Sequence, residues 1–89
     1  MSEASRPFRV LLTRRAEKDL ATLSQKMRRK LRDILVNRLA VDPHGGKKLM
    51  GELKGYFSVR LSLHDRIVYR IDEAERLVYI IRARTHFGK

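Results

Sequence analysis

The sequence predicts a small single-domain α+β fold with the element order β-α-α-β-β-β, in which a helical hairpin packs on one face of an antiparallel sheet. One short alternating segment is followed by two segments with apolar residues at helical spacing, and three alternating segments complete the pattern. A chain of 89 residues can build one hydrophobic core but not two, so residues 1–89 are expected to form one domain. Residues 1–6 are expected to be a loose tail.

The first half of the chain predicts a strand and two helices. Residues 8–13 (FRVLLT) place three apolar side chains on one face of a strand. Thr13 and Ser24 can each cap the start of a helix. The second helix is expected to run to about Val41 and to end before Pro43, because the residue before a proline avoids the helical region. The short link between the two helices predicts an antiparallel hairpin.

The second half predicts a connector and three strands. The glycine-punctuated connector spans 44–55, and the strands span 56–62, 66–72 and 76–86. The links between the strands are short and polar, so consecutive strands are expected to pair antiparallel.

The register of these strands follows from their apolar alternation. A first loop of three residues places Leu61 opposite Ile67. A second loop of three residues places Ile71 opposite Leu77. Opposed residues share a face, so the odd-numbered apolar residues would lie together against the helices. The even-numbered residues then form the other face: Ser58, Arg60, Ser62, Arg66, Val68, Arg70, Val78, Ile80, Arg82, Arg84 and His86.

This even-numbered face is rich in cations. It carries five arginines and one histidine, while the only acidic residue at an even position nearby is Asp72, at a strand end. In the expected register Arg66 lies opposite Arg82, and like charges so placed destabilise a sheet. A bound phosphate would neutralise both guanidinium groups, so the pattern predicts a polyanion-binding surface.

The charge of the whole chain points to the same kind of partner. The chain has 21 Lys+Arg against 10 Asp+Glu, a formal net charge of +11, which favours a nucleic acid or another polyanion over an ordinary solvated surface. The absence of cysteine excludes disulfides and thiolate catalysis, and no apolar run is long enough to span a bilayer. The first residues, MSEASRPF, lack the features of a secretory signal, so a cytoplasmic location is expected.

Two further patterns carry little chemistry. The stretch HGGKK lacks the spacing of a phosphate-binding loop. The histidines His44, His64 and His86 have no metal-ligand spacing and no acidic cluster beside them. No metal and no other cofactor is therefore expected.

Three short motifs carry a family resemblance. They are L-x-G-x-L-x-G-Y at 49–56, R-I-V-Y-R-I at 66–71 and R-x-H-F at 84–87. With them, residues 47–89 resemble the RelE/ParE superfamily of toxins from bacterial type II toxin–antitoxin pairs, and most closely its RelE and YoeB branches. The resemblance implies a RelE/ParE-like fold, a cognate antitoxin protein as partner and, in these two branches, cleavage of messenger RNA on the ribosome.

The resemblance also implies roles for individual residues. Arg66 matches the arginine that holds the scissile phosphate, and Arg60 matches a basic residue of the preceding strand. His86 matches the C-terminal histidine of YoeB-like members, proposed there as general acid. Two positions depart from the pattern: Phe87 stands where YoeB-like toxins often have tyrosine, and Lys47 stands where their general-base glutamate is expected.

The general base is therefore unassigned. Glu52 is the nearest carboxylate in sequence, but the family pattern does not place a base there. Lys47 or Lys48 would serve only as a neutral amine, a form that a crowded cationic site favours. Packing is the first expectation for Phe87 and base stacking the second. The residues expected to bind RNA are Arg82, Arg84, Lys47, Lys48 and Phe87.

The leading hypothesis is a toxin that acts as a ribosome-dependent, metal-independent endoribonuclease, in which the ribose 2′-hydroxyl attacks the adjacent phosphorus. One alternative is a non-enzymatic toxin of the ParE type that inhibits DNA gyrase, and another is a basic RNA-binding module without catalysis. Either kind of toxin implies an antitoxin that covers the arginine face with an amphipathic helix and acidic residues.

Overall fold

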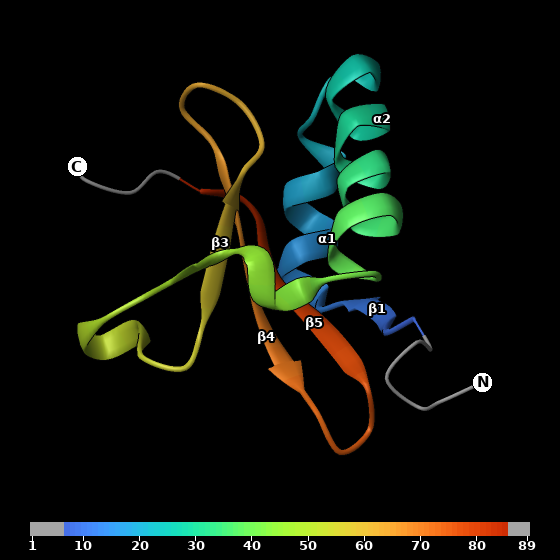
Figure 1. Cartoon of the computed structure of the whole chain (residues 1–89). Coiled ribbons are helices and arrows are strands. Elements are labelled where there is room, and N and C mark those ends of the chain that lie inside the picture. Colours follow the sequence, from blue (N-terminus) through green and yellow to red (C-terminus); the bar gives the residue numbers. More distant parts are fainter. Residues whose placement is uncertain (1–6, 86–89) are drawn as a thin grey trace.

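Figure 1 shows the computed structural model of the chain, which describes residues 7–85. Within this range, a helical hairpin lies against a five-stranded sheet of order β1-β5-β4-β3-β2. The predicted α+β class is confirmed, with one additional short strand, β2. The predicted tail at 1–6 lies outside the described residues. The elements are β1 (Arg9–Leu12), α1 (Arg14–Ala21), α2 (Gln25–Ile34), β2 (Lys47–Lys48), β3 (Phe57–Arg60), β4 (Arg66–Asp72) and β5 (Leu77–Thr85).

The two helices begin where their caps predict. The side-chain oxygens of Thr13 and Ser24 each accept a hydrogen bond of 3.2 Å from the backbone N–H three residues later. After α2 the chain continues helically through a π-helical turn at Leu35–Leu39. The helical run therefore extends almost to the predicted end at Val41.

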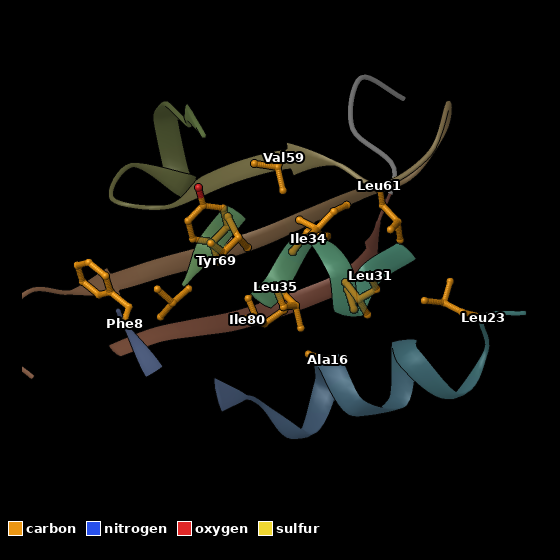
Figure 2. Close-up of a cluster of buried hydrophobic side chains, with 14 residues drawn as sticks. Phe8, Ala16, Leu23, Leu31, Ile34, Leu35, Val59, Leu61, Tyr69 and Ile80 are labelled. Carbon is orange, nitrogen blue, oxygen red and sulfur yellow. The ribbon is translucent and has the colours of Figure 1, made fainter. Parts of the chain in front are cut away.

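The hydrophobic core lies between the helices and the sheet (Figure 2). Apolar side chains from both helices meet those of β3, β4 and β5 there, and most of them are fully enclosed. Burial of this apolar area is the main stabilising contribution to a domain of this size. The core residues include Phe8, Ala16, Leu23, Leu31, Leu39, Val59, Leu61, Ile67, Tyr69, Val78, Ile80 and Ala83.

Tyr69 joins the core to the connector before β3. Its hydroxyl donates a buried 2.6 Å hydrogen bond to the carbonyl oxygen of Pro43. Burial raises the pKa of Tyr69 to about 12. Gly46 passes so close that a Cβ there would collide with the Tyr69 hydroxyl and lie 3.0 Å from the carbonyl oxygen of Ser58. A glycine is required at this position because of that close approach.

The β3–β4 hairpin keeps the predicted face but not the predicted pairs. Val59, not Leu61, lies opposite Ile67. The backbone N–H of Leu61 instead donates to the carbonyl oxygen of Asp65 (2.9 Å) within the turn. The shift is two residues, so the alternation is preserved, and Leu61 and Ile67 are both fully buried.

The predicted pairing of Ile71 with Leu77 is wrong. Ile71 pairs with Val78, because the turn between β4 and β5 has four residues and ends at Arg76 in the left-handed region (φ 52°). An odd shift of register exchanges the two faces of a strand. Val78 and Ile80, which simple alternation assigns to the even-numbered open face, are therefore fully buried in the core.

Two register shifts in the β4–β5 ladder add residues to β5, one on each side of Val68. The alternation counted from the sequence consequently fails beyond Ile80: Ile80 and Ala83, three positions apart, are both fully buried. The predicted pairing of Arg66 with Arg82 is wrong for the same reason. The observed pairs are Tyr69 with Ile80, Val68 with Arg82, and Arg66 with Thr85.

The first strand completes the sheet on the far side of β5. β1 pairs parallel with β5, so that Val10 lies beside Val78 and Leu12 beside Ile80, whereas the other strand pairs are antiparallel. The sheet is therefore mixed, not antiparallel throughout as predicted, because β5 lies between β1 and β4 and runs parallel to β1.

Candidate functional site

The sheet surface turned away from the helices is basic. Alternate residues along β3 and β4 belong to the core, and successive residues of a strand point to opposite faces. One row across this surface runs from Lys47 through Ser58 and Val68 to Arg82. We call this surface the cationic face; its basic members are Lys47, Arg60, Arg66, Arg70 and Arg82.

Arg60 and Arg66 lie directly opposite each other on β3 and β4. Arg60 is exposed, and the Nε of Arg66 donates a 3.1 Å hydrogen bond to the hydroxyl of Ser58. Ser58 and Val68, which pair with each other in the same two strands, are 1% and 3% exposed. Among residues 7–85, no carboxylate forms an ion pair with either guanidinium. Two like charges without a counter-ion are an arrangement that a bound anion stabilises.

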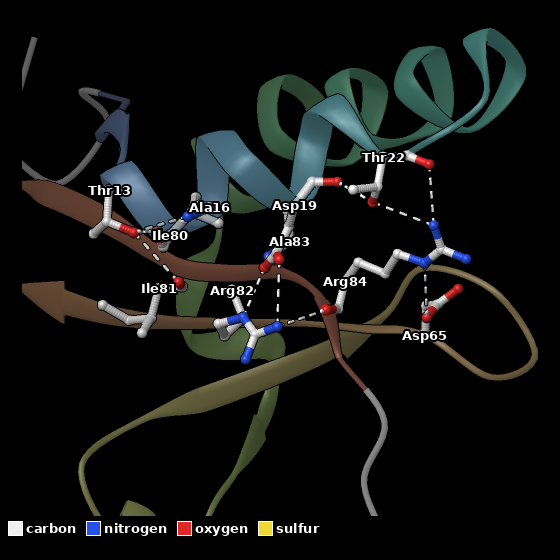
Figure 3. A network of polar contacts seen from close by, with 10 residues as sticks. All are labelled: Thr13, Ala16, Asp19, Thr22, Asp65, Ile80, Ile81, Arg82, Ala83 and Arg84. Carbon is white, nitrogen blue, oxygen red and sulfur yellow. Dashed lines mark hydrogen bonds and ion pairs between the residues drawn. The ribbon is translucent and has the colours of Figure 1, made fainter.

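Arg82 is held by a carboxylate from α1 (Figure 3). Its Nε donates to Oδ2 of Asp19 (2.7 Å) and its second terminal nitrogen to Oδ1 (3.3 Å), a bidentate pair. The backbone N–H of Ala83 donates to the same Oδ2 (3.1 Å). Burial of Asp19 opposes its ionisation, but these hydrogen bonds and the Arg82 charge outweigh burial and hold its pKa below the ordinary value.

Arg84 diverges from Arg82 (Figure 3). It donates to the carbonyl oxygen and the hydroxyl of Thr22 (3.1 and 3.2 Å), and its Nε lies 3.6 Å from Oδ1 of Asp65. The prediction that Arg82 and Arg84 share one exposed face without carboxylates is wrong, because the second register shift breaks the alternation. The roles expected for them in RNA binding stay predictions.

Lys47 and Lys48 form the short edge strand β2. Lys47 pairs with Ser58 and so belongs to the cationic face, while Lys48 pairs with Phe57 and lies on the other side. Both lysines are exposed. Glu52, the carboxylate nearest in sequence, is exposed in the 3₁₀ turn at Gly51–Leu53.

One feature of the cationic face does not follow from the expected register. Arg70 lies beside Tyr79 on the neighbouring strand, with its Cζ 4.3 Å from the centre of the ring. In the expected register Arg70 would lie opposite Val78 instead. The observed turn of four residues between β4 and β5, in place of the expected three, sets the guanidinium beside the ring.

Two of the expected site residues, His86 and Phe87, lie outside the described residues, so their roles stay predictions. Residues 7–85 contain no group of three or more histidine, aspartate or glutamate side chains arranged to hold a metal ion. Within the same range, no helix has the length and apolar character needed to cross a bilayer.

Solved structures share this architecture. The toxin–antitoxin complex RelBE2 from Mycobacterium tuberculosis matches with a TM-score of 0.82 and 32% identity over 94% of this chain and 95% of that chain. The YoeB/ParE toxin from Agrobacterium tumefaciens matches with a TM-score of 0.78 and 24% identity over 90% and 100%. The intact RelBE toxin–antitoxin complex from E. coli matches with a TM-score of 0.69 and 23% identity over 84% and 92%. The latter two show the fold alone.

These likenesses define the class of protein: a toxin of the RelE/ParE superfamily. The model of the family described as ParE toxin of type II toxin–antitoxin system, parDE, matches residues 10–86, and the chain belongs to this family. A search of curated proteins found no match. The resemblance inferred from the motifs is thereby confirmed.

Proposed function

We propose that this toxin is a ribosome-dependent endoribonuclease that cleaves messenger RNA without a metal ion. The observation that carries the proposal is the Arg60–Arg66 pair, two guanidinium groups on opposed positions of the cationic face with no carboxylate of residues 7–85 paired to them. Planar guanidinium groups bind phosphate oxygens bidentately and keep their charge at all physiological pH values.

In the proposed reaction the ribose 2′-oxygen forms a bond to the adjacent phosphorus while the bond from phosphorus to the 5′-oxygen breaks. The products are a 2′,3′-cyclic phosphate and a free 5′-hydroxyl. Arg60 and Arg66 stabilise the charge that builds up on the phosphoryl oxygens. The imidazolium of His86 gives its proton to the leaving oxygen, a step worth about 10²–10⁴ in rate.

The proton of the attacking hydroxyl needs an acceptor. Lys47 is the lysine of β2 that belongs to the cationic face, since its strand neighbour Lys48 lies on the other side, and an amine there would have to be neutral to accept this proton. Alternatively, alignment of the RNA on the ribosome supplies the in-line geometry and a solvent molecule takes the proton.

An assay on translating ribosomes tests this function. Wild type, Arg66→Ala and His86→Ala are incubated with a defined message, and the cut ends are mapped. We expect cleavage by the wild type only, with 2′,3′-cyclic phosphate at the new ends. Intact message with every protein would overturn the proposal.

A second candidate function has its own support. The matching family model is that of ParE toxins, and a toxin that acts by binding DNA gyrase needs neither acid nor base. It would also tolerate Lys47 and Phe87 where YoeB-like members have glutamate and tyrosine. Inhibition of gyrase supercoiling by the wild type, with message left intact, would establish this alternative.

We further propose a cognate antitoxin as partner. The matching RelBE2 structure from Mycobacterium tuberculosis is that of a toxin–antitoxin complex. An open cleft of about 460 Å³ lies between β1 and the helices, and its apolar lining suits the apolar side of an amphipathic helix. Arg28 and Arg32 also line this cleft. Acidic residues of such a partner would pair with these arginines and with the cationic face. The apolar lining of the cleft is formed by Phe8, Val10, Leu12, Leu20, Leu31, Leu35, Val36 and Ala40.

The antitoxin contact can be tested with two valines of similar exposure. Val36 lines the cleft and is 57% exposed, whereas Val41 is 68% exposed and lies outside it. Co-expressed Val36→Glu should lose at least about tenfold in affinity for the antitoxin, because a charge is buried against apolar groups. Val41→Glu should bind as the wild type does. Equal binding by both variants would place the antitoxin elsewhere.

A further inference from the structure

We propose that Arg70 and Tyr79 form a stacking platform that binds a nucleobase of single-stranded RNA beside the Arg60–Arg66 pair. The inference rests on the proposed ribonuclease function and extends it, because it names a base-binding position. No family motif of the sequence assigns a role to either residue.

The platform is built by the sheet itself. Arg70 and Tyr79 are direct neighbours in the β4–β5 ladder, so the backbone sets the two side chains beside each other. The Cζ of Arg70 lies 4.3 Å from the centre of the Tyr79 ring, within the range of a cation–π contact. The ring therefore covers one side of the flat guanidinium and holds it in place.

The other side of the guanidinium is open to a ligand. Arg70 is exposed, while Tyr79 is half-buried beneath it. A base stacked on Arg70 would complete a layered arrangement of ring, guanidinium and base. Stacking of this kind accepts every base, because each has a π face, so the platform would add affinity with little sequence preference.

The position of the platform suits an RNA strand bound at the arginine pair. Arg66, Val68 and Arg70 alternate along the same face of β4, with the buried Val68 between the two arginines. Arg70 follows Arg66 by four residues along β4, which corresponds to about 13 Å at the usual rise of a strand. A phosphate at Arg66 and a base at Arg70 would therefore belong to different nucleotides of one strand, and the base would lie outside the cleaved bond.

The structure contains a matched control for this contact. Arg76 lies over Phe8 with its Cζ 4.1 Å from the ring centre, a pair of the same chemistry. Phe8 belongs to the core cluster on the helix side of the sheet, away from the cationic face. Arg70→Lys and Arg76→Lys both keep the charge and remove the planar group.

The experiment measures binding of an oligoribonucleotide that carries 2-aminopurine, whose fluorescence falls when the base stacks. Purified full-length wild type, Arg70→Lys, Tyr79→Leu, Arg76→Lys and Arg66→Ala are titrated at several salt concentrations, and the melting temperature of each protein is recorded. For Arg70→Lys we expect about a tenfold loss of affinity and a smaller fluorescence change, with an unaltered salt dependence because the charge is kept. Arg76→Lys should match the wild type.

The outcomes separate the platform from the function. Wild-type affinity and fluorescence in Arg70→Lys, together with weakened binding by Arg66→Ala, would overturn the platform and leave the ribonuclease proposal intact. Weakened binding by Arg70→Lys without any message cleavage by the wild type would retain the platform and overturn the ribonuclease. A wild type that does not bind the oligoribonucleotide would overturn the platform, and the cleavage assay on translating ribosomes would then decide the ribonuclease proposal separately.

Discussion

Two regions of the basic sheet use arginine in opposite ways. On β3 and β4, Arg60 and Arg66 face each other without an ion pair to any carboxylate of residues 7–85. At the end of β5, Arg82 is bound to Asp19, and Arg84 lies beside Asp65. A guanidinium that is paired with a carboxylate stabilises the fold. A guanidinium that has no carboxylate partner is available to pair with an anionic ligand.

The difference arises from α1. Three of its polar side chains or caps reach β5: Thr13 donates to the carbonyl oxygen of Ile80 (2.9 Å), Asp19 accepts from Ala83, and Thr22 accepts from Arg84. These contacts lie along the part of β5 that contains the two register shifts. The arginines of β3 and β4 lie on the side of the sheet away from the helices, beyond the reach of such contacts.

The largest expected effect compares one arginine from each region in the cleavage assay. Arg66→Ala should lower the rate of message cleavage by about 10²–10³, since in the proposed reaction this guanidinium stabilises the transition state. Arg84→Ala should stay within roughly fivefold of the wild type, the scale of an exposed ion pair. Equal losses in the two variants would show that carboxylate pairing does not separate the two regions.

The second effect concerns stability at the end of β5. Asp19→Ala should lower the free energy of unfolding by about 2–3 kcal/mol, because Arg82 and the N–H of Ala83 lose their acceptor. Urea denaturation measures the change, with the exposed Glu17→Ala on the same helix as control. An unchanged unfolding midpoint would mean that the Asp19–Arg82 contact is not maintained in solution.

The same contact predicts a pH dependence. The pKa of Asp19 is lowered in the folded protein, so its contribution to stability is present above the ordinary aspartate value near 4 and is lost as the pH falls through the lowered pKa. The stability gap between wild type and Asp19→Asn should therefore be full at neutral pH and close on acidification. A gap that is constant between about pH 2 and pH 7 would contradict this.

A smaller effect tests the support beneath β4. Tyr69→Phe should cost about 1 kcal/mol, because it removes the buried hydrogen bond to Pro43. Burial raises the pKa of Tyr69 to about 12, so the folded protein holds this proton more tightly than the unfolded chain does. The stability of the wild type should therefore fall as the pH rises from about 10 towards 12, and the share of this loss that comes from Tyr69 should be absent in Tyr69→Phe. Tyr56→Phe, at a half-buried tyrosine, provides the control.

The smallest effect distinguishes the two lysines of β2. Lys47→Ala should reduce the slope of the logarithm of RNA affinity against the logarithm of salt concentration by about 1, since the phosphate contact proposed for Lys47 would be lost. Lys48→Ala should change the slope less, because Lys48 pairs with Phe57 on the other side. A larger change with Lys48 would indicate that the RNA crosses the edge of the sheet.

The sequence predicted the elements well because its signals there are local. The caps at Thr13 and Ser24, and the proline after the second helix, act within a few residues. The Arg60–Arg66 face was also predictable, since the β3–β4 shift of two residues preserves alternation.

The end of β5 was not predictable in this way. One more residue in the turn before it exchanged the faces of Val78 and Ile80, and two register shifts then separated Arg82 from Arg84. The part of β5 that contains those shifts contacts α1, more than 60 residues earlier in the chain, as Ala83 does through Asp19. Period-two counting contains no information about such distant partners.

The strand order has a consequence for synthesis. Of the five strands, β5 is made last, yet it lies between β1 and β4, and Arg9 must find Leu77 far along the chain. Until Leu77–Thr85 leaves the ribosome, β1 has no strand to pair with. The apolar side of the helical hairpin then cannot pack against a complete sheet. Such distant pairing slows folding and leaves the nascent chain exposed to aggregation. The toxin is thus expected to stay inert until β5 has been made.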